Sequence, residues 1–262
     1  DLLAPVFEGR RRPRGHLLPQ TLSAHAGLFD APGLGFRRIL RIAVHPAARR
    51  QGLGQRLIDA VATQAAAEGD DLIGASFGAT TGLIRFWRRC GLAPVHMGSR
   101  RNAASGVHAA VLLRALTPAG ERLLHQGRQR LLPRLAVLLG GPLRDLEPAV
   151  AAALLAGATA HARVPTEAEL RELHAFADAA RGLDATRPAL HRLLHTALPG
   201  ALADAALARP EAAALVGCGL QHRGPAEVAR QLGEPGADAV IGILRRAVAT
   251  LLRRAGPEQA SR

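Results

Sequence analysis

The chain of 262 residues contains no lysine and no tyrosine, one tryptophan, one methionine and two cysteines. The absence of lysine excludes a Walker A phosphate loop, which requires that residue. Two cysteines are too few for a disulfide framework, which favours reduced thiols and a cytoplasmic protein. The longest mostly apolar stretch, residues 149–160, is too short and too rich in alanine to span a bilayer, so no membrane association is expected.

All 34 basic residues are arginine, and they give the chain a net charge of +13. Abundant alanine and the lack of lysine point first to a GC-rich coding bias and only second to selection for arginine chemistry. Residues 1–117 hold 16 of the arginines against 7 acidic residues, so the excess is greatest there. Whatever its origin, this charge attracts polyanions such as RNA.

An apolar stretch at residues 41–46 runs into a glycine-bearing loop that opens a helix. Gly52 and Gly54 allow the backbone to approach a ligand closely, and the first N–H groups of a helix have no partners within it. Such a turn can bind a pyrophosphate. It is not the dinucleotide fingerprint, because Leu57 stands where that pattern requires glycine.

Hydrophobic periodicity predicts an α/β region followed by a mainly helical one. Strands are expected at residues 36–44, 70–77, 92–97 and 108–116, and helices at 54–68 and 83–90. In the first helix, Leu57, Ile58, Val61 and Ala65 share one face. After residue 117 the pattern becomes helical, with capping signals at Thr117 with Pro118 and at Thr166 with Glu169.

Four ordered blocks carry a family resemblance: GRRRPRGHLLPQTL (9–22), RIAVHP (41–46), SFGAT (76–80) and RFWRRCGL (85–92). Together they resemble the tRNA(Met) cytidine acetyltransferase family. The loop is similar to the pyrophosphate loop of GCN5-related N-acetyltransferases, with Arg49 or Gln51 ahead of Gly52 and Gly54. The resemblance is specific over residues 1–117 and loose beyond them.

The resemblance implies a partial GCN5-related N-acetyltransferase (acyl-CoA N-acyltransferase) domain at residues 1–117 and a helical tRNA-contacting domain at 118–262. A complete domain of this type has a strand, two helices and two more strands before the acetyl-CoA strand, and about 40 residues cannot supply them. We therefore expect the chain to be a C-terminal portion, inactive or feeble alone. The implied reaction moves acetyl from acetyl-CoA to N4 of the wobble cytidine of elongator tRNA(Met). ATP and Mg would act in an upstream helicase-like module.

The resemblance also implies a set of cofactor contacts. Backbone groups of the strand end would line the pantetheine arm beside a splay in the sheet, the loop would cradle the pyrophosphate, and an arginine on the following helix would approach the cofactor. These residues are Ile42, Ala43, Val44, Arg49, Arg50, Gln51, Gly52, Leu53, Gly54, Gln55 and Arg89. One departure is Gly82, where relatives tend to place an acidic residue, so any contact made by that carboxylate is in doubt.

His45 is the candidate general base. The exocyclic amine of cytosine is neutral but delocalised, so a base is needed during the attack, and imidazole suits that role. A histidine before proline at a strand end is equally typical of a capping residue. Arg10, Arg11, Arg12 and Arg14 form a cluster that could hold RNA phosphates, hold the 3′-phosphate of the cofactor, or remain a solvated loop.

Several other residues favour structural roles. Phe86 and Trp87 are expected in the core, and Cys90 as a buried thiol. His191 and His195 lie one helical turn apart without a third ligand, so no metal is expected. Two competing functions stay open: an acetyltransferase of the same fold acting on a protein or small-molecule amine, and an RNA-binding protein without catalysis.

Overall fold

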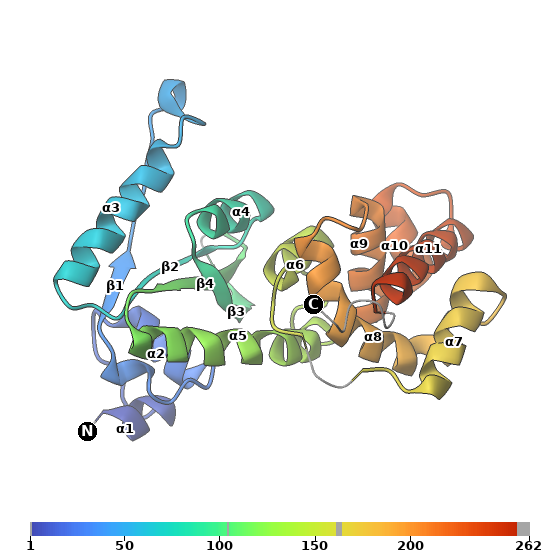
Figure 1. Ribbon diagram of the computed structural model, residues 1–262, viewed down its shortest axis with the longest axis horizontal. Helices are drawn as coiled ribbons and strands as arrows, with labels where there is room; N and C mark the ends of the chain where they lie inside the picture. The colour runs from blue at the N-terminus through green and yellow to red at the C-terminus, as the bar shows by residue number, and fades with distance from the viewer. Residues whose placement is uncertain (1, 104, 161–163, 256–262) are drawn as a thin grey trace. The chain divides into compact units, whose positions relative to one another are not determined.

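The structure is a computed structural model that describes residues 2–103, 105–160 and 164–255. The chain divides into two compact units, Asp1–Leu131 and Leu132–Arg262. The first unit is mixed α/β and the second is helical (Figure 1). The first unit contains α1 (Leu3–Phe7), α2 (Leu17–Ala24), η1 (Ala31–Gly33), β1 (Phe36–Ile39), η2 (Pro46–Ala48), α3 (Leu53–Ala67), β2 (Leu72–Gly78), α4 (Thr81–Arg89), β3 (Ala93–Arg101) and β4 (His108–Ala115).

The four strands form one mixed sheet in the order β1-β2-β4-β3. β1 and β2 are parallel, whereas β4 runs antiparallel to both of its neighbours. The strand register pairs Phe36 with Leu72 and Ile39 with Ala75. β2 continues to Gly78 against β4, so β1 leaves the sheet three residues before its neighbour ends.

The predicted strand at 36–44 is therefore wrong at its C-terminal end. Ile42, Ala43 and Val44 lie outside any strand, because the chain diverges from β2 after the Ile39–Ala75 pair and makes no further ladder. This divergence is the splay that the family resemblance implied. It leaves the backbone of residues 42–44 without strand partners on the β2 side.

One face of the sheet packs against α2 and the first turns of α5 (Pro118–Leu139). Leu72, Leu113 and Val95 meet Leu18 and Leu22 of α2 in a buried apolar cluster. Side chains alternate between the faces of a strand, so their neighbours point the other way. Figure 1 shows α4 on the opposite side of the sheet from α2.

The second face carries α3 and α4. Phe77 of β2 stacks on Trp87 of α4 with ring centroids 5.8 Å apart. Arg114 of β4 joins the two helices, since its guanidinium donates to the Asp59 carboxylate of α3 at 2.7 Å and to the Cys90 carbonyl at 3.4 Å. The sheet thus fixes the spacing of α3 and α4.

The buried face of α3 differs from the predicted one. Ile58, Ala62 and Ala65 are buried, whereas Leu57 is half exposed. The buried face differs from the predicted one because the first turns of α3 line two cavities, and Leu57 lines the second of them.

The predicted caps of the later helices are confirmed. Thr117 accepts a hydrogen bond from the Gly120 N–H, and α5 begins at Pro118. Thr166 and Glu169 form a complete capping box at the start of α7 (Glu167–Asp178). The expected division at residue 117 remains a prediction, while the boundary between the compact units lies inside α5.

The second unit is built around α11 (Ala237–Ala255), which packs against four other helices. These are α7, α8 (Leu183–Ala203), α9 (Arg209–Ala214) and α10 (Pro225–Leu232); α6 (Pro148–Leu155) and the π-helical turn η3 (Leu215–Leu220) complete the unit. Within the described residues, none of the helices combines the length and apolar character needed to cross a bilayer.

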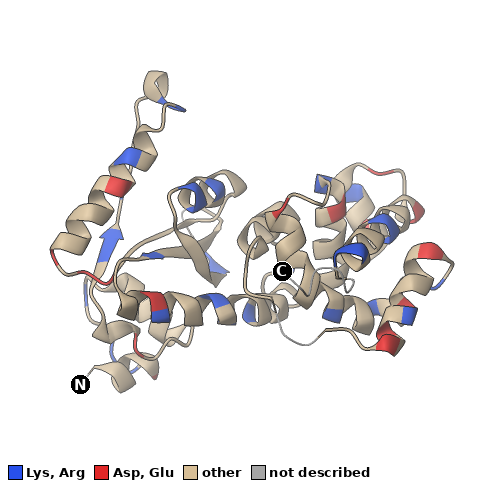
Figure 2. Ribbon diagram, in the orientation of Figure 1, with Lys and Arg blue, Asp and Glu red and all other residues tan. Residues whose placement is uncertain are grey.

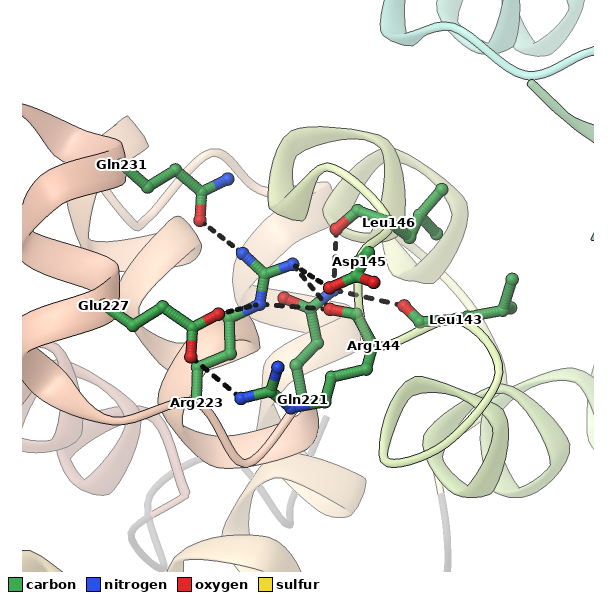
Figure 3. Close-up of polar contacts among 8 residues, drawn as sticks. All are labelled: Leu143, Arg144, Asp145, Leu146, Gln221, Arg223, Glu227 and Gln231. Atoms are coloured by element: carbon green, nitrogen blue, oxygen red, sulfur yellow. Dashed lines mark hydrogen bonds and ion pairs between the residues drawn. The ribbon is translucent and has the colours of Figure 1, made fainter. Parts of the chain in front are cut away.

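A buried arginine ties this unit together (Figure 3). Arg223, 7% exposed, donates two hydrogen bonds to the Arg144 carbonyl and one to the Gln231 side chain at 2.7 Å. Glu227 receives the Arg144 guanidinium at 2.8 Å and lies 3.6 Å from Arg223. Gln221 beside it donates to the Leu146 carbonyl at 2.6 Å. The network links the segment after α5 to α10.

Candidate cofactor cavity

A cavity of about 670 Å³ opens where the chain leaves β1 and enters α3. Its size lies within the usual range for small-molecule sites. It is lined by the chain leaving β1, the loop before α3 and one side of α4: Ile42, Ala43, Val44, Ala48, Arg49, Arg50, Gly52, Leu53, Gly54, Gln55, Leu83, Phe86, Arg89 and Cys90. Of the residues expected at the cofactor, Gln51 alone is not among these lining residues.

The loop conformation depends on two left-handed residues. Arg50 has φ 64° and Gly52 has φ 76°, and Gly52 is the N-cap of α3. The first N–H groups of α3, from Leu53 onward, have no carbonyl partner within the helix, and the helix dipole places partial positive charge there. The loop therefore presents a positive end to the cavity.

Arg49 fastens the loop to the strand exit. Its Nε donates to the Val44 carbonyl at 3.2 Å, and its backbone N–H donates to the Pro46 carbonyl at 3.3 Å. The Arg56 guanidinium reaches the Gln51 carbonyl at 3.5 Å. Arg49 and Arg50 are exposed, so their charges add to the positive end of α3 without burial.

Gly54 is required by a close approach of α3 to α4. A Cβ atom at this position would lie 3.0 Å from Cε2 and 3.2 Å from Cζ of Phe86. The half-buried Phe86 ring therefore sets one wall of the cavity directly against the first turn of α3. The prediction that Phe86 and Trp87 are core residues is confirmed for Trp87, which is 5% exposed, and is wrong for Phe86, which lines the cavity.

α4 contributes one side to the cavity wall, of which only Arg89 was predicted from the sequence. Thr80 caps this helix by accepting from the Leu83 N–H at 3.3 Å. Leu83, Phe86 and Arg89 then follow at a spacing of three, which places them on one side. Starting from Arg89, this spacing was the available signal for the two residues that were missed, whereas Ala48 gave none.

Cys90 closes the wall beside Arg89. The thiol is buried, as expected, and burial raises its pKa, so it stays in the neutral form near neutral pH. A protonated thiol is a weak nucleophile, so Cys90 serves the cavity as a small apolar surface.

His45 lies at the mouth of a neighbouring hollow of about 500 Å³, which shares Ala43, Val44, Ala48 and Leu53 with the first cavity. The ring is exposed, and Nδ1 accepts a hydrogen bond from the Ala47 N–H at 3.4 Å, so His45 caps η2. In the neutral ring this bond places the proton on Nε2. The residue thus combines the capping role with a position beside the cavity.

The arginine cluster lies elsewhere in the first unit. Arg10, Arg11, Arg12 and Arg14 are exposed in the segment between α1 and α2, and Arg10 pairs with Glu8. The block that follows them contributes to a second cavity of about 420 Å³, which shares no described lining residue with the first.

Histidines of the second unit come close together without forming a metal centre. The rings of His191 and His195 are 4.4 Å apart, and burial lowers the pKa of His191. Across the ranges that the structure describes, no group of three or more His, Cys, Asp or Glu side chains is arranged to hold a metal ion.

The comparisons with known proteins agree on one family. The family model GNAT acetyltransferase 2 matches residues 60–117, from the middle of α3 to the end of β4. Three curated relatives carry the name tRNA(Met) cytidine acetyltransferase TmcA. That of Nitrosococcus halophilus (strain Nc4) is 40% identical over 258 residues, covering 98% of this chain and 35% of the relative.

The relative from Yersinia pestis (strain D106004) is 42% identical over 206 residues, covering 76% of this chain and 28% of the relative. That of Methanopyrus kandleri is 33% identical over 236 residues, covering 89% of this chain and 28% of the relative. The chain thus spans about a third of the length of the curated relatives it matches. On these similarities, the chain belongs to the tRNA(Met) cytidine acetyltransferase family.

Proposed function

We propose that this chain holds acetyl-CoA for an RNA acetyltransferase that modifies N4 of the wobble cytidine of elongator tRNA(Met) in the cytoplasm. One observation carries the proposal: the strand exit, the loop at 49–55 and the inner face of α4 enclose a single cavity in a chain of this family. ATP and Mg would act in an upstream helicase-like module, outside the elements described above.

The residues present fit coenzyme A. The space at Gly54 is a cradle that a Cβ would fill, and the positive end of α3 faces the same cavity. Leu83 and Phe86 supply apolar surface for a pantetheine arm. When bound, acetyl-CoA supplies an activated thioester carbonyl.

Each part of the wall has a task. The N–H groups at the start of α3 bind the diphosphate, and Arg49 and Arg50 add charge-assisted hydrogen bonds. Backbone groups of Ile42, Ala43 and Val44, released from the sheet by the splay, orient the arm. Arg89 of α4 lines the same cavity and provides a further positive charge.

His45 acts as the general base through a change of tautomer. Its Nε2 carries the proton while Nδ1 accepts from Ala47, so accepting a substrate proton at Nε2 requires the existing proton to move to Nδ1 and the cap to open. At 3.4 Å this cap is a long hydrogen bond, and giving it up costs about 0.5–1.5 kcal/mol at most. The position therefore permits the base role at small cost.

tRNA as the acceptor is supported by the names of the relatives and by the charge. The relatives are named for tRNA(Met) cytidine, and the net charge of +13 favours a polyanionic substrate over a neutral small molecule.

Two measurements test the proposal. Titration calorimetry of the chain with coenzyme A should give saturable binding, and transfer of labelled acetyl from acetyl-CoA by the protein that contains the chain should label elongator tRNA(Met) at cytidine. Absence of binding heat would leave only a non-catalytic RNA-binding role. Binding together with labelling of peptides or small amines, and not of tRNA, would instead assign an acetyltransferase of the same fold with another acceptor.

A further inference from the structure

Two phenylalanines of the first unit lie together on the surface. Phe7 is 41% exposed and Phe29 is 43% exposed, with ring centroids 5.4 Å apart at an interplanar angle of 65°. Among the described residues, the remaining aromatic side chains are buried or half-buried. In a chain with six phenylalanines, one tryptophan and no tyrosine, this exposed pair is a large share of the aromatic surface.

The fold holds this pair on a packed base. Val6 and Leu28, which precede the two phenylalanines in the chain, are 2% and 1% exposed, and Leu28 packs in the apolar cluster beneath the sheet. α1 packs against both α2 and η1, which brings the end of α1 to the residues before η1. Because Val6 and Leu28 supply the core contacts of these two segments, the phenylalanine rings beside them stay at the surface.

Arginines follow Phe7 in the chain and contact the backbone two residues before Phe29. Residues 10–14 carry four of them, beginning three residues after Phe7, and the Arg11 N–H donates to the Pro5 carbonyl of α1 at 2.9 Å. Near the other ring, the Arg130 guanidinium of α5 donates to the Gly27 carbonyl at 2.6 Å. The backbone of the arginine segment is thus attached to α1, and the Arg130 guanidinium is held next to the residues before Phe29.

Two acidic residues accompany these cations, and they do not cancel them. Glu8 pairs with Arg10, and Asp30 follows Phe29. Within the part of the chain that the structure describes, no ion pair engages Arg11, Arg12 or Arg14. The surface therefore offers exposed aromatic rings and an excess of positive charge together.

We propose that Phe7, Phe29 and the arginines of residues 10–14 form a binding platform for single-stranded RNA. Bases stack on the exposed ring faces while guanidinium groups bind the phosphates, which is how proteins hold unpaired nucleic acid. RNA satisfies both halves of the surface, whereas an acidic peptide would leave the rings unused. The platform rests on the proposed RNA substrate and adds to it a contact surface outside the cofactor cavity.

The rings are tested with a single-stranded RNA about 12 nucleotides long, within the usual site size, and an abasic strand of equal length. Fluorescence anisotropy with the whole chain should show affinity for the RNA about 5- to 100-fold weaker in Phe7→Leu and Phe29→Leu. The abasic strand has the same phosphates and no bases, so its affinity should not change. Val137→Ala, at a side chain 76% exposed on α5, is the matched control.

The arginines are tested by the salt dependence of binding. Arg12→Gln should lower the slope of log affinity against log salt by about 1, because one phosphate contact is lost. Arg12→Lys keeps the charge and should keep the slope. Thermal melting of each variant identifies any that fail to fold, and leucine in place of phenylalanine preserves the apolar contacts beneath the ring.

The outcomes separate this proposal from the proposed function. If wild-type chain binds the RNA and both phenylalanine variants bind equally well, the platform is refuted while the RNA substrate stands. If wild-type chain binds coenzyme A but neither this RNA nor elongator tRNA(Met), the RNA substrate fails as well. Binding of anionic lipid vesicles that depends on Phe7 and Phe29, with RNA binding unaffected, would assign the surface to a membrane and overturn the proposal.

Discussion

Gly54 shows how one missing side chain shapes the cavity. α3 can begin against α4 only because nothing projects from this residue toward Phe86. The same chain offers a natural contrast at Gly82, the second residue of α4, where an added Cβ would meet no atom within 4 Å. A side chain added at Gly54 would therefore disturb the packing of α3 against α4, whereas one added at Gly82 would disturb no contact.

Gly54→Ala should weaken coenzyme A binding about tenfold, since overpacking of this kind costs on the order of 1–3 kcal/mol. The added methyl group forces Phe86 toward the cavity. Gly82→Ala should leave binding unchanged and stabilise the fold by about 0.5–1 kcal/mol, because alanine favours the helix. Calorimetry with coenzyme A and urea unfolding measure the two effects, and equal affinities of the two variants would contradict the packing argument.

His45→Ala should slow acetyl transfer by about 10²–10⁴-fold in a single turnover, the usual contribution of general base catalysis. Coenzyme A affinity should stay near that of the wild type, because His45 does not line the larger cavity. His45→Asn is the matched control, since its side-chain oxygen can accept from Ala47 but cannot act as the base. Wild-type turnover in either variant would leave His45 with the capping role alone.

Cys218 should make the stability of the protein fall at high pH. Burial raises the pKa of this thiol from 9.0 to about 11. Above pH 9 the thiol ionises in the unfolded protein but stays neutral in the folded protein. The free energy of unfolding that this thiol contributes below pH 9 is therefore lost as the pH rises toward about 11. The loss should reach about 2–3 kcal/mol. Urea unfolding from pH 8 to 11 measures it, and Cys218→Ala should show a shallower fall; an identical profile would refute the assignment.

At the scale of elements, the second unit depends on Arg223 as a connection between the segment after α5 and α10. Arg223→Ala should destabilise the protein by about 3 kcal/mol, because the Arg144 carbonyl and the Gln231 side chain lose their donor inside the unit. Arg230→Ala, at an exposed arginine of α10, should change the free energy of unfolding by less than about 0.5 kcal/mol. Equal melting temperatures of both variants would show that the network contributes nothing net.

Element prediction succeeded where the determinants are local. The caps at Thr117 and Thr166 depend on residues three positions away, and both are present as predicted. The predicted end of the strand at 36–44 was wrong because the length of this strand is set by its pairing with β2. The register of that pairing cannot be derived from the apolar run itself. Leu57 was misplaced for a similar reason, since it lines a hollow whose position depends on tertiary packing.

The residues of the candidate cavity could likewise be predicted only in part. The glycine loop could be predicted because Gly52 and Gly54 signal a backbone requirement that is visible in sequence. Leu83 and Phe86 carried only a weak signal, their spacing from Arg89, since a leucine and a phenylalanine in a helix are typical of any core. Their role follows only from the placement of α4 beside α3, which Arg114 and the sheet determine.

At the scale of the whole molecule, arginines occur in both units and outnumber the acidic residues by 34 to 21 (Figure 2). The arginine excess should make tRNA binding strongly dependent on salt, with log affinity falling by about 0.9 for each phosphate contact per unit of log salt. We expect a slope steeper than about −3 between 50 and 200 mM salt, which corresponds to more than about three phosphate contacts. Filter binding with elongator tRNA(Met) measures it, and a slope near zero would mean that the charge takes no part in recognition.

The left-handed backbone at Arg50 has a consequence for how this loop tolerates change. A side chain at φ 64° costs the fold about 1–2 kcal/mol, and glycine would remove that cost but lose about 0.5–1 kcal/mol to the greater freedom of the unfolded chain. Glycine at residue 50 is thus favoured over arginine for folding by about 0–1.5 kcal/mol. Arg50→Gly should therefore keep or slightly raise the free energy of unfolding, so a loss of coenzyme A affinity in this variant would report on the guanidinium and not on unfolding.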